Sequence, residues 1–155
     1  MKAIHWTIAA AALACTEPVQ AGINDPEVII YRFPGVADSG DMPNVGVATV
    51  FHCTNFSGVT ENVRFATRNF DGALATNVAF PVAHLATLSA PTHNTNAYGR
   101  EFSMGTLAVQ QGTTAIAATS INIICTAVTI DASTTVPIGV TLRGIRFNPV
   151  PGSQE

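Results

Sequence analysis

The sequence predicts a single all-β domain built from two packed sheets. Three observations lead to this fold class. Apolar and polar residues alternate with a period of two along much of the chain, which places every second side chain on the same face of a strand. Gly, Pro, Asn and Asp interrupt these runs at short intervals. No stretch after residue 21 shows the apolar spacing of three to four residues that an amphipathic helix needs.

The first three expected strands each follow from this alternation. They are residues 27–33, 45–54 and 61–70. Residues 36–44 between the first two are rich in turn formers and predict a loop. In the second strand Val47, Thr49, Phe51 and Cys53 share one face, and in the third Val63 and Phe65 point inward while Arg64 and Arg68 point outward.

Four further strands are expected in the second half of the chain. They are residues 77–88, 98–110, 115–130 and 136–147. Asp71-Gly72 predicts the hairpin turn that leads into the first of these. Pro81 cannot donate a ladder hydrogen bond, so that strand is expected at a sheet edge or broken. Gly144 is expected to form a bulge in the last strand.

The first 21 residues have the three-part organisation of a cleaved secretory signal peptide. Lys2 gives a positive start, and the uncharged apolar run 7–14 is shorter than the about 20 residues of a membrane-spanning helix. Val19-Gln20-Ala21 then provides the compact residues that a signal peptidase reads. The predicted mature domain is therefore residues 22–155, secreted to the periplasm or out of the cell. Cleavage before Cys15, as in a lipoprotein, remains the alternative.

Cleavage after residue 21 leaves two cysteines, Cys53 and Cys125. An even number of cysteines in an exported domain favours a disulfide. Both lie on the apolar faces of their strands, so we expect one bridge that crosses the core and joins the two sheets. Strand counting places them on the second and sixth strands, as in immunoglobulin domains. The predicted fold is therefore a seven-stranded immunoglobulin-like β-sandwich with one inter-sheet disulfide, although the only Trp, Trp6, lies in the leader and Ile123 stands where antibody domains have Tyr.

Two blocks of the mature chain carry a pattern of turns and core strands. In the first, residues 50–57 contain a Cys-Thr-Asn turn, 61–64 begin a strand, and 69–72 form an Asp-Gly hairpin. The second comprises the cysteine strand at 123–127 and the end of the last strand at 146–149. This pattern resembles that of small secreted bacterial β-sandwich proteins of unknown function. The resemblance implies a fold and a compartment, and no activity comes with it.

Charge is scarce, and this excludes some classes of partner. Charged residues make up 11% of the chain, the formal net charge is −3, and the only lysine is Lys2 in the leader. Nucleic-acid binding needs a clustered positive field, which this composition lacks. After removal of the leader, no second hydrophobic span and no basic amphipathic helix predicts membrane association.

Three histidines, His52, His84 and His93, remain in the mature chain. None has a second His or Cys at the spacing of a metal site. Cys125 is not followed by the His and Met of a blue-copper centre. We therefore expect unconnected surface histidines and neither a metal nor another cofactor.

The remaining candidate sites are weak. Asp38 and Asp41 share a loop and would supply oxygens to calcium, although capping of turns is the usual role of such residues. Asn55-Phe56-Ser57 matches the N-glycosylation triplet, but its expected role is the turn. No Ser lies in a Gly-x-Ser-x-Gly elbow, and no Gly-rich phosphate loop is present. No catalytic residue is therefore assigned.

The leading interpretation is a secreted, non-enzymatic structural or interaction module whose partner is unknown. One alternative is a subunit of a fimbrial or coat-like surface assembly. It would pair with another protein or with itself through a sheet edge, as the low charge and the bland strand 115–130 suggest. The other alternative is a hydrolase with a site built from loops, and convergence of His84, His93 and an acidic residue in one pocket would support it strongly.

Overall fold

The computed structural model describes residues 22–39, 42–105 and 107–147, so the predicted signal peptide and cleavage site lie outside the described residues. Within these ranges the chain forms nine strands and no helix. The strands are β1 (Val28–Asp38), β2 (Val47–Asn55), β3 (Glu61–Arg68), β4 (Leu74–Val82), β5 (Thr87–Pro91), β6 (Val109–Ala118), β7 (Ile123–Asp131), β8 (Gly139–Leu142) and β9 (Ile145–Arg146). The all-β prediction is confirmed, and the count of seven strands is wrong.

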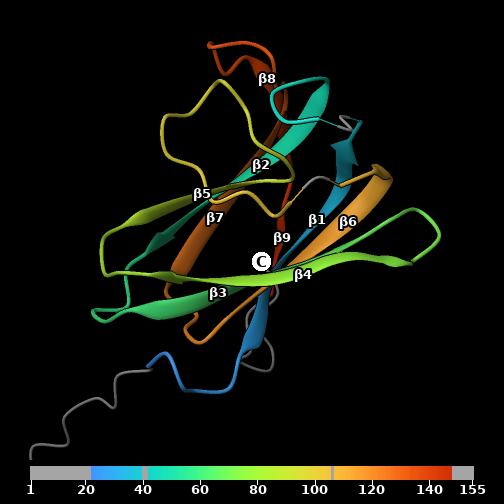
Figure 1. Ribbon diagram of the computed structural model, residues 1–155. Coiled ribbons are helices and arrows are strands. Elements are labelled where there is room, and N and C mark those ends of the chain that lie inside the picture. The colour runs from blue at the N-terminus through green and yellow to red at the C-terminus, as the bar shows by residue number, and fades with distance from the viewer. Residues whose placement is uncertain (1–21, 40–41, 106, 148–155) are drawn as a thin grey trace, which may run out of the picture.

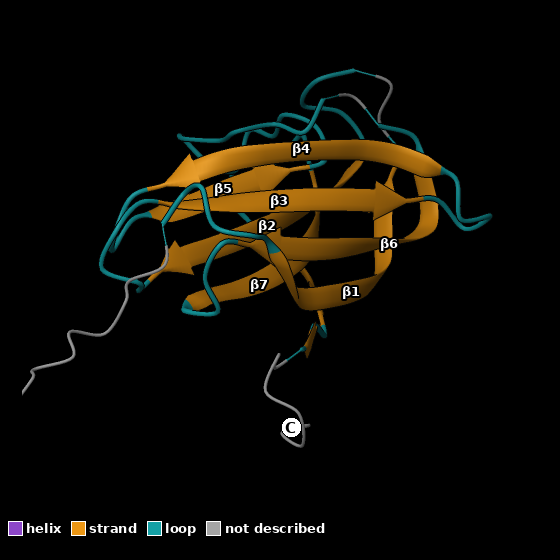
Figure 2. Cartoon of the chain, turned by 90° about the horizontal axis from the view of Figure 1, so that it is seen from below, coloured by secondary structure: helices purple, strands orange, loops and turns teal. Residues whose placement is uncertain are grey.

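Two antiparallel sheets pack face to face (Figure 1, Figure 2). The larger has the order β4-β3-β6-β1-β9 and the smaller β5-β2-β7-β8. An immunoglobulin domain pairs its first two strands in one sheet, whereas β1 and β2 lie in different sheets here. The immunoglobulin-like classification is therefore not confirmed. The chain instead crosses repeatedly between the two sheets, for example from β1 to β2, from β2 to β3 and from β6 to β7.

Three phenylalanine rings form the centre of the core and connect the sheets. Phe51 on β2 of the smaller sheet lies between Phe33 on β1 and Phe65 on β3 of the larger sheet, with ring centroids 5.5 and 5.6 Å apart. All three side chains are fully buried. Such edge-on and tilted contacts add to the free energy of burying the rings. The predicted inward orientation of Val63 and Phe65 is confirmed, because both are 0% exposed.

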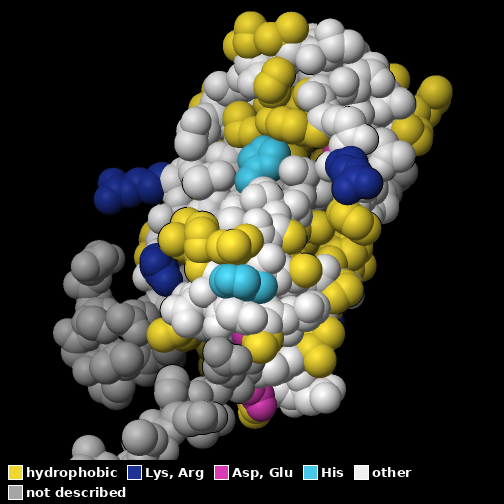
Figure 3. Space-filling model, turned by 90° about the vertical axis from the view of Figure 1, so that its left-hand side faces the viewer, with side chains coloured by type: hydrophobic (Ala, Val, Ile, Leu, Met, Phe, Trp, Pro, Cys, Tyr) yellow, Lys and Arg dark blue, Asp and Glu magenta, His cyan; other side chains and the backbone are white. Residues whose placement is uncertain are grey.

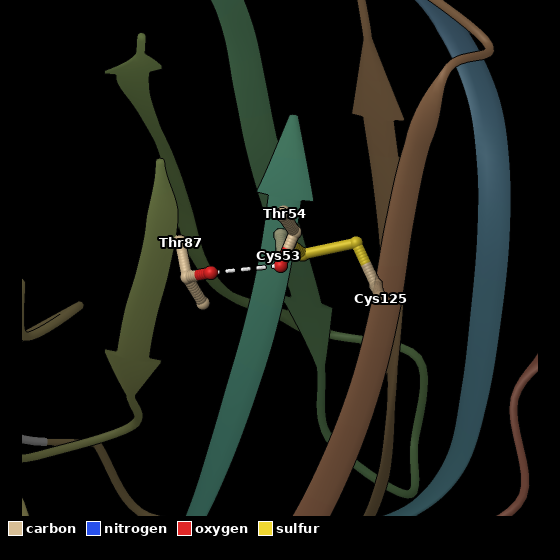
Figure 4. Close-up of a disulfide and its surroundings, with 4 residues drawn as sticks. All are labelled: Cys53, Thr54, Thr87 and Cys125. Atoms are coloured by element: carbon tan, nitrogen blue, oxygen red, sulfur yellow. Dashed lines mark hydrogen bonds between the residues drawn. A yellow bond between two sulfur atoms is a disulfide. The ribbon is translucent and has the colours of Figure 1, made fainter. Parts of the chain in front are cut away.

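The disulfide forms as predicted, but within one sheet. Cys53 on β2 bonds Cys125 on β7, the neighbouring strand of the smaller sheet (Figure 4). The two residues are direct partners in the strand register, with Cα atoms 4.2 Å apart. The prediction of an inter-sheet bridge is wrong because β2 pairs with β7, so two inward-facing cysteines meet side by side. On the opposite face, the hydroxyls of Thr54 and Thr87 hydrogen-bond at 2.8 Å and join β2 to β5.

The hairpin and edge predictions are confirmed around β3 and β4. Asp71-Gly72 lies in the turn between them, where Gly72 adopts a φ of 83° that favours glycine. β4 ends its sheet, and Pro81 lies within it. The expected strand 77–88 also breaks, because residues 83–86 leave the sheet before β5 begins.

Two other predicted strands are each divided. The expected strand 115–130 is wrong as a single element, since β6 ends at Ala118 and β7 begins at Ile123. Residues 119–122 turn the chain from the larger sheet into the smaller one, and Ser120 Oγ accepts the N–H of Asn122 at 3.1 Å in this turn. The expected strand 136–147 divides at Gly144, where an added Cβ would lie 2.4 Å from the ring of Phe33. Most of the expected strand 98–110 is a loop.

Candidate functional site

Asp38 and His93 form a buried acid–histidine pair at one end of the smaller sheet. Asp38 is the last residue of β1, and His93 lies in the loop after β5. His93 Nδ1 is 2.8 Å from Asp38 Oδ2, and the side chains are 1% and 0% exposed. A buried carboxylate and imidazole must be hydrogen-bonded to be stable. The pair therefore fastens the loop to β1, and the prediction of a surface histidine at this position is wrong.

The second nitrogen of this imidazole, Nε2, differs from Nδ1 in its hydrogen bonding. His93 Nε2 is buried and has no hydrogen-bond partner among the described residues. The loop that carries it folds back over the outer face of the smaller sheet, where Val50 is also buried. The backbone N–H of Thr92 donates to the carbonyl of Thr49 at 2.9 Å and holds the beginning of this loop against β2. The arrangement anchors a loop and leaves no room for a reactant at Nε2.

A cavity of about 440 Å³ opens near the end of β1. Its lining residues are Asp38, Ser39, Asn69, Phe70, Ala108 and Gln110. Asn69 Oδ1 accepts the backbone N–H of Gln110 at 3.0 Å. Asp41, the second expected calcium ligand, lies outside the described residues. In the part of the chain that is described, no group of three or more His, Cys, Asp or Glu side chains is placed to hold a metal.

His52 and Ser89 make a second histidine contact, on the outer face of the smaller sheet. They are direct partners on β2 and β5, and Ser89 Oγ lies 3.0 Å from His52 Nδ1. The ring of Tyr98 packs edge-on against the imidazole, with centroids 4.8 Å apart. Burial lowers the pKa of His52, and the charge of Glu101 partly offsets this effect. His52 is therefore neutral at neutral pH.

A hydroxyl beside a neutral imidazole is the first contact of a nucleophilic site. The carboxylate that would orient the imidazole is committed elsewhere, because Glu101 accepts the N–H of Thr95 at 2.8 Å and also the Thr95 hydroxyl. Burial and the negative charge of Glu101 together raise the pKa of Tyr98. These contacts join loop 95–101 to the sheet. The side chains of His52, Ser89, Tyr98 and Glu101 therefore form a polar cluster rather than a complete catalytic triad.

His84 lies far from His93 along the sheet. It is exposed between β4 and β5, and its Nδ1 accepts the backbone N–H of Gly58 at 3.0 Å, just beyond the C-terminal end of β2. The His93 pair lies at the opposite end of that strand, where Ser39 donates its N–H to the carbonyl of Val47. Among the described residues, His84, His93 and an acid do not converge in one pocket, so this support for a loop-built hydrolase is not found.

The buried side chain of Asn55 stabilises the corner between β2 and β3. Asn55 is 0% exposed, and its amide nitrogen donates to the carbonyls of Val59 and Val82, each at 2.7 Å. Its oxygen accepts the N–H of Ser57 at 2.8 Å. With both amide hydrogens engaged in a buried turn, Asn55 is not available for glycosylation in the folded protein.

Glu61 is a buried carboxylate that the sequence analysis did not single out. It accepts the Thr119 hydroxyl at Oε2, while Oε1 is buried without a hydrogen-bond partner among the described residues. The alternation of β3 contains the signal that would have found it, because Glu61 shares the inward face of Val63 and Phe65.

Three large apolar side chains are exposed to water close together, on β8 and just before it. Val136, Ile138 and Val140, here called the apolar strip, are 56%, 79% and 71% exposed. Val140 pairs with Thr129, whose hydroxyl contacts that of Thr49 on the core side of β2. The strip therefore begins on the inward face of the smaller sheet, at an end that the larger sheet does not cover. Figure 3 shows that hydrophobic and histidine side chains are also exposed on one broad side of the molecule.

The geometry defines a two-sheet, all-β domain with one disulfide, and comparison with known proteins adds no relative to it. No protein-family description, no curated protein and no solved structure matches the chain. Among the described residues there is no helix long and apolar enough to cross a membrane.

Proposed function

We propose that this chain is an exported, non-enzymatic interaction module that works by contact with another protein surface. The observation that carries the proposal is the apolar strip. Soluble proteins seldom place neighbouring large apolar side chains in water unless a partner covers them. No charged residue occurs from Ala132 to Leu142, so nothing in this segment opposes burial of the strip.

Export is part of the same proposal. The three-part leader at residues 1–21 supports secretion, and a Cys53–Cys125 disulfide is compatible with an oxidising compartment. A small domain that must persist outside the cytoplasm benefits from such a bridge, because the bridge restricts the unfolded chain.

The apolar strip can be tested with a fluorescent dye that binds exposed apolar surface. We expect the folded protein to bind the dye and the Ile138→Ser/Val140→Ser variant to bind measurably less of it at an unchanged melting temperature. Thr141→Ser, on the same strand, is the matched control and should leave dye binding intact. Equal dye binding by wild type and the double variant would contradict the proposal.

A direct assay separates this proposal from the hydrolase alternative, for which the Ser89–His52 contact is the specific observation. A nitrophenyl acetate ester should be hydrolysed no faster than in buffer containing free imidazole. Turnover above that level which Ser89→Ala abolishes would show that the protein is an esterase and would overturn the non-enzymatic assignment.

A further inference from the structure

The four sheet edges of the molecule are protected to very different degrees. The edge of β5 is paired, because Phe102 donates its N–H to the carbonyl of Ser89 and Met104 donates to Pro91, both at 2.9 Å. β8 spans four residues and β9 two, so each offers little backbone. β4 spans nine residues and lies at the outside of its sheet (Figure 2). Long uncovered edges are the usual sites of strand addition.

The strand register shows which backbone groups of β4 are free. Asn62 on β3 is engaged on its β6 side, since its N–H donates to Thr119 Oγ1 and its carbonyl accepts the Thr119 N–H. Its partner on β4, Pro81, is therefore in a non-hydrogen-bonded pair and points its backbone outward. Alternation along the strand then points Ala79 and Asn77 outward as well. No described backbone group outside β3 bonds to this stretch.

Two features bound the regular part of this edge. Pro81 has no N–H to offer at one end. At the other end the register shifts, because Thr67 pairs with Thr76 and Arg68 with Leu74, which leaves Ala75 bulged. The regular stretch between them is Thr76–Phe80, and its centre is Val78.

We propose that β4 pairs with β4 of a second copy of this chain, antiparallel and about a two-fold axis at Val78. In this register Asn77 and Ala79 of one copy exchange N–H···O=C bonds with Ala79 and Asn77 of the other. Val78 faces Val78 of the second copy, a β-branched cross-strand pair of the kind that stabilises sheets. The missing N–H of Pro81 and the bulge at Ala75 fall outside the central pairs.

Charge supports a second copy as the occupant. β4 contains no charged residue, so two copies approach each other without like-charge repulsion along the strand. Two cations lie beside it on β3: Arg64 is neutralised by Glu27, with Nε and Oε2 2.6 Å apart, and Arg68 donates to the carbonyl of Gly72 at 2.9 Å. A charged partner strand would find no counter-charge on β4, whereas an identical strand matches it in charge and length.

The decisive comparison uses two substitutions at Asn77. Asn77→Pro removes an outward N–H that makes no bond within the monomer, and proline is tolerated at such edge positions. Asn77→Ala keeps the N–H and removes only the side chain. Sedimentation velocity over a range of concentrations should show a dimer for wild type and for Asn77→Ala. The dimer of Asn77→Pro should have a dissociation constant at least about tenfold higher than that of wild type, since the pair of copies loses two hydrogen bonds.

A second pair of variants keeps the test valid if the proline variant fails to fold. Asn77→Lys puts a lysine on the edge of β4. Natural edge strands often carry lysine, which prevents another strand from pairing with them. Thr126→Lys adds the same charge to the exposed face of β7 and is the matched control. We expect the first to give monomers and the second to remain dimeric. In wild type, hydrogen exchange at the Asn77 and Ala79 amides should slow as protein concentration rises.

The outcomes separate this inference from the proposed function, which uses a different surface. A wild-type protein that stays monomeric at all concentrations would overturn the inference and leave the apolar strip untouched. So would a dimer that Ile138→Ser/Val140→Ser dissociates and the Asn77 variants do not, which would place the contact on β8. If β4 instead pairs with a strand of another protein, wild type should form no dimer but a heterologous complex, which Asn77→Pro should lose and Asn77→Ala should keep. That outcome would also overturn pairing with a second copy.

Discussion

The loop after β5 and the apolar strip, which runs from just before β8 into that strand, depart in opposite directions from the usual distribution of side chains. The loop buries His93 against Asp38, whereas the strip leaves Ile138 and Val140 in water. Burial of a polar group is tolerated when its hydrogen bond is made inside the chain. The free-energy cost of exposing apolar surface to water is removed only when another surface covers it. The first region therefore makes its acid–histidine contact within one molecule, whereas the second is the surface that the proposed partner would cover.

The largest effect should come from the bridge that joins the two central strands of the sheet bearing both regions. Replacing Cys53 and Cys125 by Ala should lower the free energy of unfolding by about 4 kcal/mol, from the chain-entropy argument for residues 72 apart in sequence. Chemical denaturation monitored by circular dichroism is the measurement. The spectrum of the folded variant should stay all-β, because strand pairing does not depend on the bridge. An unchanged denaturation midpoint would show that the bridge does not restrict the unfolded chain.

The buried pair should come next. His93→Ala leaves the Asp38 carboxylate buried without its imidazole, which should cost about 3 kcal/mol. His84→Ala removes an exposed imidazole and should change stability by less than about 0.5 kcal/mol. Equal losses from the two substitutions would remove the distinction between the buried and the exposed histidine.

His52 lies between buried His93 and exposed His84 in its degree of burial, because loop 95–101 covers part of its imidazole. Burial lowers its pKa, so its nuclear magnetic resonance titration midpoint should lie below 6.5. Folded His52 resists protonation, and its contribution to stability is therefore full above about pH 6.5 and is lost as the pH falls through the folded pKa. Glu101→Gln should lower the midpoint further, since the charge of Glu101 raises it. A midpoint that rises in this variant would contradict the assigned causes.

The smallest effect is expected on the apolar strip itself. Ile138 is 79% exposed, so Ile138→Ala should change the stability of the isolated chain by less than about 0.5 kcal/mol. Ile123 is fully buried, and the same substitution there should cost about 2–5 kcal/mol. A large loss at Ile138 in dilute solution would mean that the strip already packs against something within the chain.

Particular residues show how far sequence reasoning reaches into the fold. Pro81 predicted an edge strand because proline cannot donate a ladder hydrogen bond, whatever its neighbours are. Asp71-Gly72 predicted its turn because turn geometry is local. The prediction of a single strand over 115–130 failed, because β6 and β7 lie in different sheets and the apolar pattern does not mark where the chain crosses between them. The candidate site was largely missed for a similar reason: nothing next to His93 in the sequence points to Asp38.

The sequence by itself determined the fold class, the alternation that buries Val63 and Phe65, and the pairing of Cys53 with Cys125. These depend on local periodicity and on the presence of just two cysteines after residue 21. Only the tertiary structure decided that β2 lies beside β7, and this neighbour relation turned the expected inter-sheet bridge into one within a sheet. It also decided which edges stay open and which polar groups are buried. Strand order is set by contacts between distant segments, and an alternating pattern shows which face of a strand is buried but not which strand lies beside it.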